Sequence, residues 1–428
     1  IFGFVTWLNG ALIPFLQVVC QLTETQALMI ASCFYFAYVV MALPMAMILE
    51  KVGYQSAMVL GLSIIALGLL GFIPAALLQE FWIFLVAQFV IGSGLTILQT
   101  AANPYVVNVG PTHSAAARIA IMGLLNKGAG ILAPVLFTAW VLGGFSDINL
   151  ADVNHMAPQE QQLQIENMAH QLITPYVGMA VALLILAGGL SRIALPDLAL
   201  IQSPSDDNSS AHDTDQHDTN KTTIWQFPQL ILGAVALFLY VGVEVIAGDT
   251  IGLYGASIGV ANATTLTSYT MGFMVLGYLL GLACIPRFIS QVNALRLSAL
   301  AGVAISVALL FASNEQTQIS QILWGWAGIT TLPNSVALIA LLGLANAMVW
   351  PTLWPLALAG LGRFTPKGSA ILIMGIAGGA LLPLIYGQLA HSSNSQAAYW
   401  ILLPGYFIIG FYAFYGQGMR NWTRKSPS

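Results

Sequence analysis

Apolar runs of about 20 residues follow one another along nearly the whole chain, and this pattern most restricts the fold. A helix of about 20 apolar residues is long enough to cross the roughly 30 Å hydrocarbon layer of a membrane. Charged residues make up only 7% of the 428 residues, whereas soluble domains carry about 25%. So few charges could not cover a water-facing surface, and the sequence therefore predicts a protein embedded in a lipid bilayer.

Twelve of these runs have the length and composition of membrane-spanning helices. Their approximate ranges are 1–20, 25–49, 55–77, 81–107, 115–143, 172–195, 226–250, 264–285, 293–313, 335–361, 367–391 and 396–417. The stretch 314–334 is too polar to span, and we expect an outside loop there with Trp324 and Trp326 at the membrane interface. The predicted fold class is an all-α membrane protein with twelve transmembrane helices.

The lysines and arginines separate to one side of this predicted topology. With the N-terminus inside, all but one of the 12 cations fall in loops or tails on the cytoplasmic side. They are Lys51, Arg118, Arg192, Lys221, Arg287, Arg296, Arg363, Lys367, Arg420, Arg424 and Lys425. The opposite loops carry acids and no cation. Because cytoplasmic loops are enriched in Lys and Arg, both termini are predicted to be cytoplasmic.

The chain divides near its middle. Residues 203–223 are polar, acidic and without apolar periodicity, which is typical of a flexible linker. We therefore expect two six-helix bundles, residues 1–196 and 225–428, joined by a cytoplasmic linker at 197–224. A short repeat supports this division, because GAGILAP at 128–134 returns as AGGALLP at 377–383 in the fifth span of each half. Parallel repeats of this kind place a binding site at their interface near the bilayer midplane.

Three ionisable residues lie inside predicted membrane helices: Lys127 in the fifth, and Glu244 and Asp249 in the seventh. A charge at the bilayer centre costs about 2.5–3.5 kcal/mol on insertion scales, so such residues face the interior and find a partner. They indicate either an ion or substrate pathway or a structural ion pair that joins two helices. Asp249 is close to the predicted outer end of its helix, where water could solvate it. A Lys127–Glu244 pair would cross between the two halves.

Uncharged polar and aromatic residues form a second group on helices one, four, five and ten. Carboxamides offer paired donors and acceptors that suit vicinal hydroxyls, and indole faces suit the C–H face of a sugar ring. A single Asn in a membrane helix also serves as a contact between helices, and spaced tryptophans also pack in cores or face lipid. Together the group favours a neutral, hydroxyl-rich ligand. The candidate substrate-binding residues are Trp7, Asn9, Gln99, Asn103, Asn126, Asn346, Trp350 and Trp354.

No motif of an enzyme is present in the sequence. It contains no phosphate-binding loop, His-x-x-x-His pair, nucleophile elbow or CxxC, and no basic run that could follow a nucleic-acid backbone. The three cysteines, Cys20, Cys33 and Cys284, all lie in apolar runs and are expected to be free core residues. We expect neither catalytic activity, nor a resident cofactor, nor a metal site.

Several stretches resemble a known family. The segment LEKVGYQSAMVLG at 49–61 resembles a reduced form of the loop motif of the major facilitator superfamily. GFVTWLNGALIPFL at 3–16, QTAANPYVVNVGP at 99–111 and YVGVEVIAG at 240–248 are similar to the fucose–galactose–glucose:cation symporter family within it. The resemblance covers nearly the whole chain, and it implies cation-coupled sugar uptake by alternating access in a bacterial inner membrane.

Departures from the fucose branch narrow the expected substrate. That branch has an Asp and a Glu where this sequence has Gly10 and Gln99. Glu244 instead matches an acid of the glucose/galactose branch, and the Asn126–Lys127 pair fits that branch or its N-acetylglucosamine relatives. The resemblance therefore implies symport of a neutral hexose such as glucose or galactose, with H⁺ or Na⁺ as the coupling ion.

The expected assignment has Lys127 and Glu244 as the coupling pair, Asp249 as a further coupling residue, and the amides and indoles as sugar ligands. The protein is expected to work as a monomer whose partners are a small sugar and the lipid bilayer. Three alternatives stay open: a lipid or drug transporter of the same fold, a sugar uniporter, and a transporter-like receptor that binds sugar without moving it.

Overall fold

The computed structural model describes residues 2–8, 12, 15–17, 19–20, 22–108, 115–141, 158–193, 195, 223–285, 287–361 and 364–422, and these residues form helices and no strand. Nine helices in this part of the chain are long and apolar enough to cross a membrane. They are Lys51–Leu78, Phe81–Ala102, Gln159–Arg192, Pro228–Ser257, Ala263–Cys284, Gln291–Leu310, Asn334–Leu358, Ile371–Ser392 and Ala397–Gly418. Each coincides with a predicted span, so the all-helical membrane class is confirmed.

Two further predicted spans contain the shorter apolar helices Ser32–Ala42 and Ile121–Phe137. The first predicted span begins with helix α1 (Phe2–Trp7), and several residues after it, including Asn9, lie outside the described part of the chain. The predicted linker lies outside it too, apart from Thr223 and Ile224. The proposed division into two bundles therefore stays a prediction from the sequence.

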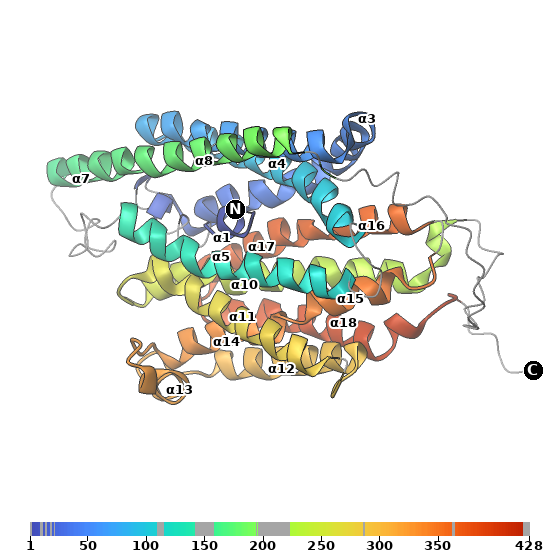
Figure 1. Ribbon diagram of the computed structural model, residues 1–428. Helices are drawn as coiled ribbons and strands as arrows, with labels where there is room; N and C mark the ends of the chain where they lie inside the picture. Colours follow the sequence, from blue (N-terminus) through green and yellow to red (C-terminus); the bar gives the residue numbers. More distant parts are fainter. Residues whose placement is uncertain are drawn as a thin grey trace, which may run out of the picture.

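Helix α3 (Glu24–Leu78) contains the second and third predicted spans and turns back at Gly53. Gly53 has φ 77°, a left-handed conformation that costs glycine little because it has no Cβ. The helix begins at Thr23, whose hydroxyl accepts from the backbone of Gln26 in a capping box. This reversal lets the two arms of α3 pack against α4 (Phe81–Asn108) and α8 (Ile173–Arg192). These helices form the layer at the top of Figure 1.

The second half of the chain supplies the remaining long helices. They are α10 (Pro228–Ser257), α11 (Leu266–Cys284), α12 (Gln291–Leu310), α14 (Asn334–Asn346), α15 (Val349–Leu358), α16 (Thr365–Met374), α17 (Gly378–Ser392) and α18 (Leu402–Phe414). Helix α10 packs against α17, α18, α15 and α14 and buries most of its residues, including the acids Glu244 and Asp249. It is therefore the central helix of this half.

Two helix pairs join the halves. Helix α5 (Ala115–Val141) packs along α11, and α17 packs along α3. Figure 1 shows α1, α5, α10 and α17 between the upper layer and the layer of α12 and α18 below. Helices α5 and α10 carry the buried charged residues Lys127 and Glu244, so the seam is where a site can form.

The polar segment 314–334 folds as a loop with a short helix, α13 (Gln318–Leu323), and a 3₁₀ turn, Gly325–Ala327, at the lower left of Figure 1. Helix α7 (Pro158–Gln171) lies at the same end, in the upper layer. The prediction that it does not span is confirmed. Trp324 is only 7% exposed and packs against the rings of Tyr269 and Phe273, whereas its predicted position at the membrane interface stays a prediction. Trp326 is 82% exposed, as an interfacial residue would be.

Candidate functional site

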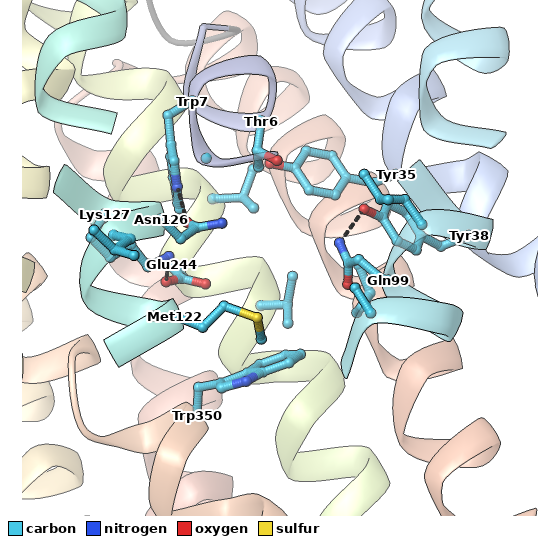
Figure 2. A pocket seen from close by; sticks show the side chains of 18 of the residues that line it. Thr6, Trp7, Tyr35, Tyr38, Gln99, Met122, Asn126, Lys127, Glu244 and Trp350 are labelled. Carbon is cyan, nitrogen blue, oxygen red and sulfur yellow. Dashed lines mark hydrogen bonds and ion pairs between the residues drawn. The ribbon is translucent and has the colours of Figure 1, made fainter. Parts of the chain in front are cut away.

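A cavity of about 510 Å³ lies on the seam between the two halves (Figure 2). Its size falls within the range of small-molecule sites, about 300–1,000 Å³. Helices α1, α3, α4, α5 and α8 line one side of it, and α10, α11 and α15 with the turn at Ile376 line the other. Its polar or aromatic lining residues are Thr6, Trp7, Tyr35, Tyr38, Gln99, Asn126, Lys127, Tyr240, Glu244, Tyr278 and Trp350.

An ion pair crosses the seam at this cavity. The Lys127 ammonium on α5 donates to Oε1 of Glu244 on α10 at 2.6 Å, with side chains only 10% and 8% exposed. The ammonium also lies 4.1 Å from the centre of the Trp7 ring, at cation–π distance. The predicted contact between these two ionised residues is confirmed. A pair with so little water around it depends on each partner to offset the desolvation of the other.

Trp7 holds the lysine from one side and the neighbouring asparagine from the other. Its indole N–H donates to Oδ1 of Asn126 at 3.0 Å, which fixes that amide at the cavity wall (Figure 2). Helix α1 reaches α5 closely because Gly3 lies directly on the Asn126 backbone, where a Cβ would overlap the carbonyl. One indole therefore organises both the amide and the ammonium.

The Trp7 ring also closes one end of the cavity. It packs with Met271 and Met274 of α11 into a small apolar cluster between the halves. Gly248 of α10 leaves the space for it, since a Cβ there would lie 2.6 Å from the indole. This contact seals the seam beside Glu244 on the side away from the rest of the cavity.

The opposite wall of the cavity carries a second polar group. Gln99 on α4 donates through Nε2 to the Tyr38 hydroxyl on α3 at 2.5 Å. Tyr35, one turn from Tyr38, lies beside them, and its buried hydroxyl has no hydrogen-bond partner. Carboxamide and phenol groups can both donate and accept, so this wall can bind hydroxyls.

Trp350 supplies an aromatic face. It lies on α15, with the Tyr240 ring centred 6.3 Å away and the Trp354 ring 5.5 Å away. Figure 2 shows the Trp350 indole across the cavity from Asn126 and Trp7, with Met122 between. The cavity therefore has amides, phenols and an ion pair on some walls and an indole face on another.

The cavity is closer to one face of the protein. Its lining residues fall in the first half of α5 and near the ends of α4 and α8. These helix ends adjoin the segments in which the sequence places the lysines and arginines, at the right of Figure 1. The Trp7 cluster forms the closed end, on the side of the acidic loops.

Comparison with known proteins identifies the family. A sequence profile described as Major Facilitator Superfamily matches residues 1–363. The chain belongs to the Major Facilitator Superfamily. It is a multi-pass membrane protein of this transporter family, as the apolar helices also indicate.

Two of its relatives in the superfamily have names that state a sugar. It is 32% identical over 420 residues to a glucose/galactose transporter of Brucella abortus (strain 9-941), covering 97% of this chain and 91% of the relative. It is 27% identical over 392 residues to the L-fucose-proton symporter of Escherichia coli (strain K12), covering 91% and 84%.

Solved structures share the Major Facilitator Superfamily fold. A superfamily transporter crystallised in the outward conformation matches with a TM-score of 0.69 and 24% identity, covering 99% of this chain and 97% of that one. The xylose transporter of E. coli in a partially occluded inward-open conformation matches with a TM-score of 0.63 and 11% identity, covering 96% and 94%. At these identities the matches show the fold alone.

Most of the residues that the sequence singled out meet at the cavity. Trp7, Gln99, Asn126 and Trp350 line it, as do Lys127 and Glu244. Asn9 and the side chain of Asn103 lie outside the described part of the chain. Their assignment as ligands stays a prediction.

Two predicted ligands lie away from the cavity lining. Asn346 is fully buried and accepts from the Tyr406 hydroxyl at 2.8 Å, which ties α14 to α18. Trp354 packs behind Trp350, and its indole N–H is buried without a hydrogen-bond partner. In this arrangement Asn346 joins two helices and Trp354 supports the aromatic wall, whereas neither reaches the cavity.

Asp249 is more deeply placed than the sequence indicated. We considered that water could solvate it near a helix end, but α10 continues to Ser257 and Asp249 is 0% exposed. The tyrosines of the cavity were missed altogether. Tyr240 precedes Glu244 by four residues, which places both on one helix face, and this spacing could have identified it.

The described residues contain no group of three or more His, Cys, Asp or Glu that could hold a metal ion. The ionisable groups at the site are instead one lysine and one glutamate at its wall, with Asp249 beyond them. Such a set can exchange a proton or a monovalent cation through a carboxylate. It offers no arrangement of nucleophile and base for covalent catalysis.

Proposed function

We propose that this chain is a secondary active transporter that moves a neutral hexose, glucose or galactose first, together with a cation by alternating access. The observation that carries the proposal is the cavity between the two halves, which combines amides, an indole face and an ion pair that crosses the seam. A ligand bound there touches both halves, so its binding energy depends on how they are arranged.

The polar walls fit a sugar. The amides of Gln99 and Asn126 offer donors and acceptors for hydroxyl groups, and Trp350 offers an apolar face for the ring carbons. Asn9 and Asn103 would add two further amides. The names of the relatives that match over almost their whole length, glucose/galactose transporters at 32% and 30% identity, support a hexose.

The ion pair supplies the coupling element of the proposal. While Lys127 neutralises Glu244, the two halves are held together at the closed end of the cavity. Entry of a proton or a sodium ion beside the carboxylates would weaken this attraction and change the balance between inward-open and outward-open states. We take the proton as the coupling ion and sodium as the alternative.

The remaining parts of the proposal concern location and assembly. The distribution of Lys and Arg supports a bacterial inner-membrane protein with both termini in the cytoplasm. We further propose that the protein works as a monomer without a resident cofactor. With this orientation the cavity faces the cytoplasm.

Transport by purified protein in liposomes tests the proposal. Radiolabelled glucose, galactose, fucose and N-acetylglucosamine are offered in counterflow and then under a proton or a sodium gradient imposed separately. We expect counterflow with glucose or galactose and accumulation with a proton gradient. Counterflow without dependence on either gradient would leave a uniporter, and sugar binding without counterflow would leave a receptor.

Trp350 gives a specific test of the sugar site. Trp350→Ala removes an aromatic contact worth about 1 kcal/mol, so the half-saturating sugar concentration should rise roughly fivefold. Trp326→Ala is the matched control, because that indole is 82% exposed and is not among the residues that line the cavity. Equal affinities for both variants would exclude Trp350 as a sugar contact.

A second candidate function follows from the apolar end of the same cavity. Leucines of four helices in the first half line it: Leu62, Leu98, Leu125, Leu186 and Leu190. Leu125 is 69% exposed, so this end is open to the surface of the helix bundle, as the site of a lipid or drug transporter would be. Thermal stabilisation of the purified protein by octyl glucoside or lipid, with none by free hexoses, would favour this second function.

A further inference from the structure

Asp249 is a buried acid with no hydrogen-bond partner among the residues that the structure describes. Its side chain is 0% exposed, and neither carboxyl oxygen has a hydrogen-bond partner. It follows Glu244 by five residues on α10, about 7.5 Å further along the helix axis, towards the acidic-loop side. The charges that act on it are those of Glu244 on its own helix and Lys127 on α5. It therefore belongs electrostatically to the ion pair without touching the cavity.

Within the described part of the chain, the other elements around Asp249 contribute hydroxyl groups, and the charges that act on it are only those of Glu244 and Lys127. Tyr35 of α3 is a titratable neighbour, with a buried hydroxyl that is itself without a hydrogen-bond partner and lies at the cavity wall. Tyr399 faces the adjacent Thr250, with its hydroxyl 2.9 Å from that of the threonine. On the α11 side, Thr267 and Thr270 direct their hydroxyls to carbonyls of α10.

The balance of charges among the three residues decides the state of Asp249. Lys127 carries one positive charge, which the carboxylate of Glu244 already neutralises at 2.6 Å. An ionised Asp249 would leave a net negative charge in a place that offers its oxygens no donor. Burial of such an unpaired charge costs far more than protonation of the group, so the acid is neutral in this arrangement.

The position of Asp249 separates it from the cavity. Trp7 packs on Gly248, the residue directly before it, and this contact closes the cavity on the acidic-loop side. Rearrangement of the Trp7 contact would open Asp249 to water on that side. Access to the acid and access to the cavity are therefore controlled by the same contact.

We propose that Asp249 is the proton carrier of coupled transport, with one proton moved for each sugar, and that the Lys127–Glu244 pair supplies the countercharge. This inference rests on the proposed function. Water on the acidic-loop side gives a proton to the carboxylate, and an O–H bond forms. In the closed arrangement of this structure Asp249 keeps that proton, because its side chain is fully buried and does not line the cavity. A further rearrangement that brings Asp249 to the cavity breaks the O–H bond, and the proton passes to water there, while the positive charge of Lys127 acts on the carboxylate that is left.

A proton fits this place better than a sodium ion. Sodium requires several oxygen ligands around it, whereas the described residues provide no cluster of three acids and no hydrogen-bond partner for the oxygens of Asp249. A proton requires only one carboxyl oxygen. Lys127 carries one positive charge, whereas Glu244 and Asp249 can carry two negative charges. One further positive charge can therefore bind and leave in each transport cycle.

Asp249→Asn tests the proposal, because the amide has the size of the neutral acid and cannot release a proton. In liposomes with the membrane potential clamped to zero, an inward gradient of about one pH unit should let the unaltered protein accumulate hexose about tenfold, as one proton per sugar requires. Asp249→Asn should exchange labelled for unlabelled sugar and reach only equal concentrations on the two sides. Glu315→Gln, an exposed acid in a loop, is the control and should accumulate sugar like the unaltered protein.

The outcomes separate this inference from the proposed function. If the unaltered protein exchanges no sugar, the proposed function fails. If the unaltered protein exchanges sugar and the Asp249→Asn variant still accumulates sugar, Asp249 is not the proton carrier. The same conclusion follows if the Asp249→Asn variant neither exchanges nor accumulates sugar. Accumulation driven by sodium alone, or a measured stoichiometry of two protons, would also overturn the assignment.

Discussion

The buried pair of Lys127 and Glu244 can be tested by removing its charges singly and together. Lys127→Met leaves the Glu244 carboxylate at the seam without its ammonium, and Glu244→Gln leaves the ammonium without its carboxylate. The double variant leaves two neutral side chains of similar size. If each charge depends on the other, the double variant will be more stable than either single variant.

The magnitude follows from the burial of the pair. Breaking a buried ion pair by removing one partner costs about 3–5 kcal/mol, and replacing both partners with neutral groups is close to neutral. Both side chains line a cavity that water can enter, so we take the lower end, ~3 kcal/mol for each single variant. The double variant should cost about 1 kcal/mol, including the lost contact of the ammonium with the Trp7 ring, whereas additive effects would give about 6 kcal/mol.

Thermal unfolding of the purified proteins in one detergent measures this order. Both single variants should melt several degrees below the unaltered protein, and the double variant should recover most of the difference. Lys51→Met is the control for loss of a lysine charge, because Lys51 is exposed at the turn of α3, and its melting temperature should not change. A double variant that melts no higher than the less stable single variant would refute the reasoning. All three pair variants should lose gradient-driven sugar accumulation.

Two further predictions concern packing at the seam and within the second half. Gly248→Ala should weaken the closed end of the cavity and slow sugar exchange, because the new Cβ would lie 2.6 Å from the Trp7 ring. Gly272→Ala is the control and should exchange sugar at the normal rate, because no atom lies within 4 Å of the added Cβ. Equal exchange rates for the two variants would argue against the closure. Tyr406→Phe should lower the unfolding free energy by about 1–3 kcal/mol because Asn346 loses its buried donor, and an unchanged melting temperature would contradict that role.

Much of the fold could be predicted because lipid imposes a simple rule on sequence. A membrane helix must be apolar over about 20 residues, so its position can be recognised without knowledge of its neighbours. Helix ends were predicted less well, since α10 continues to Ser257, well past the predicted end at 250. The apolar pattern does not mark that end, because Asp249 and Thr250 look like the start of a polar loop although both are fully buried.

The residues of the candidate site that could be predicted from the sequence were those whose side chains are unusual in a membrane helix: charged groups, amides and spaced tryptophans. Lys127 and Glu244 stood out by charge, and the structure shows them in contact. Tyr35 and Tyr38 carry no charge, and tyrosines are common in membrane helices, so the sequence did not single them out. Asn346 shows the opposite difficulty, since a buried amide can bind a ligand or join two helices, and only the position of its partner on α18 distinguishes the two.

Because Trp7 already donates a hydrogen bond to the side-chain oxygen of Asn126, a ligand at this wall must compete with the indole for that oxygen. A hydroxyl that donates to Oδ1 of Asn126 takes the place of the indole N–H, or shares the oxygen with it. The same indole lies against the Lys127 ammonium and fills the space over Gly248. A ligand that binds the Asn126 amide would therefore displace the Trp7 ring, and this displacement would change both the contact with the Lys127 ammonium and the packing over Gly248.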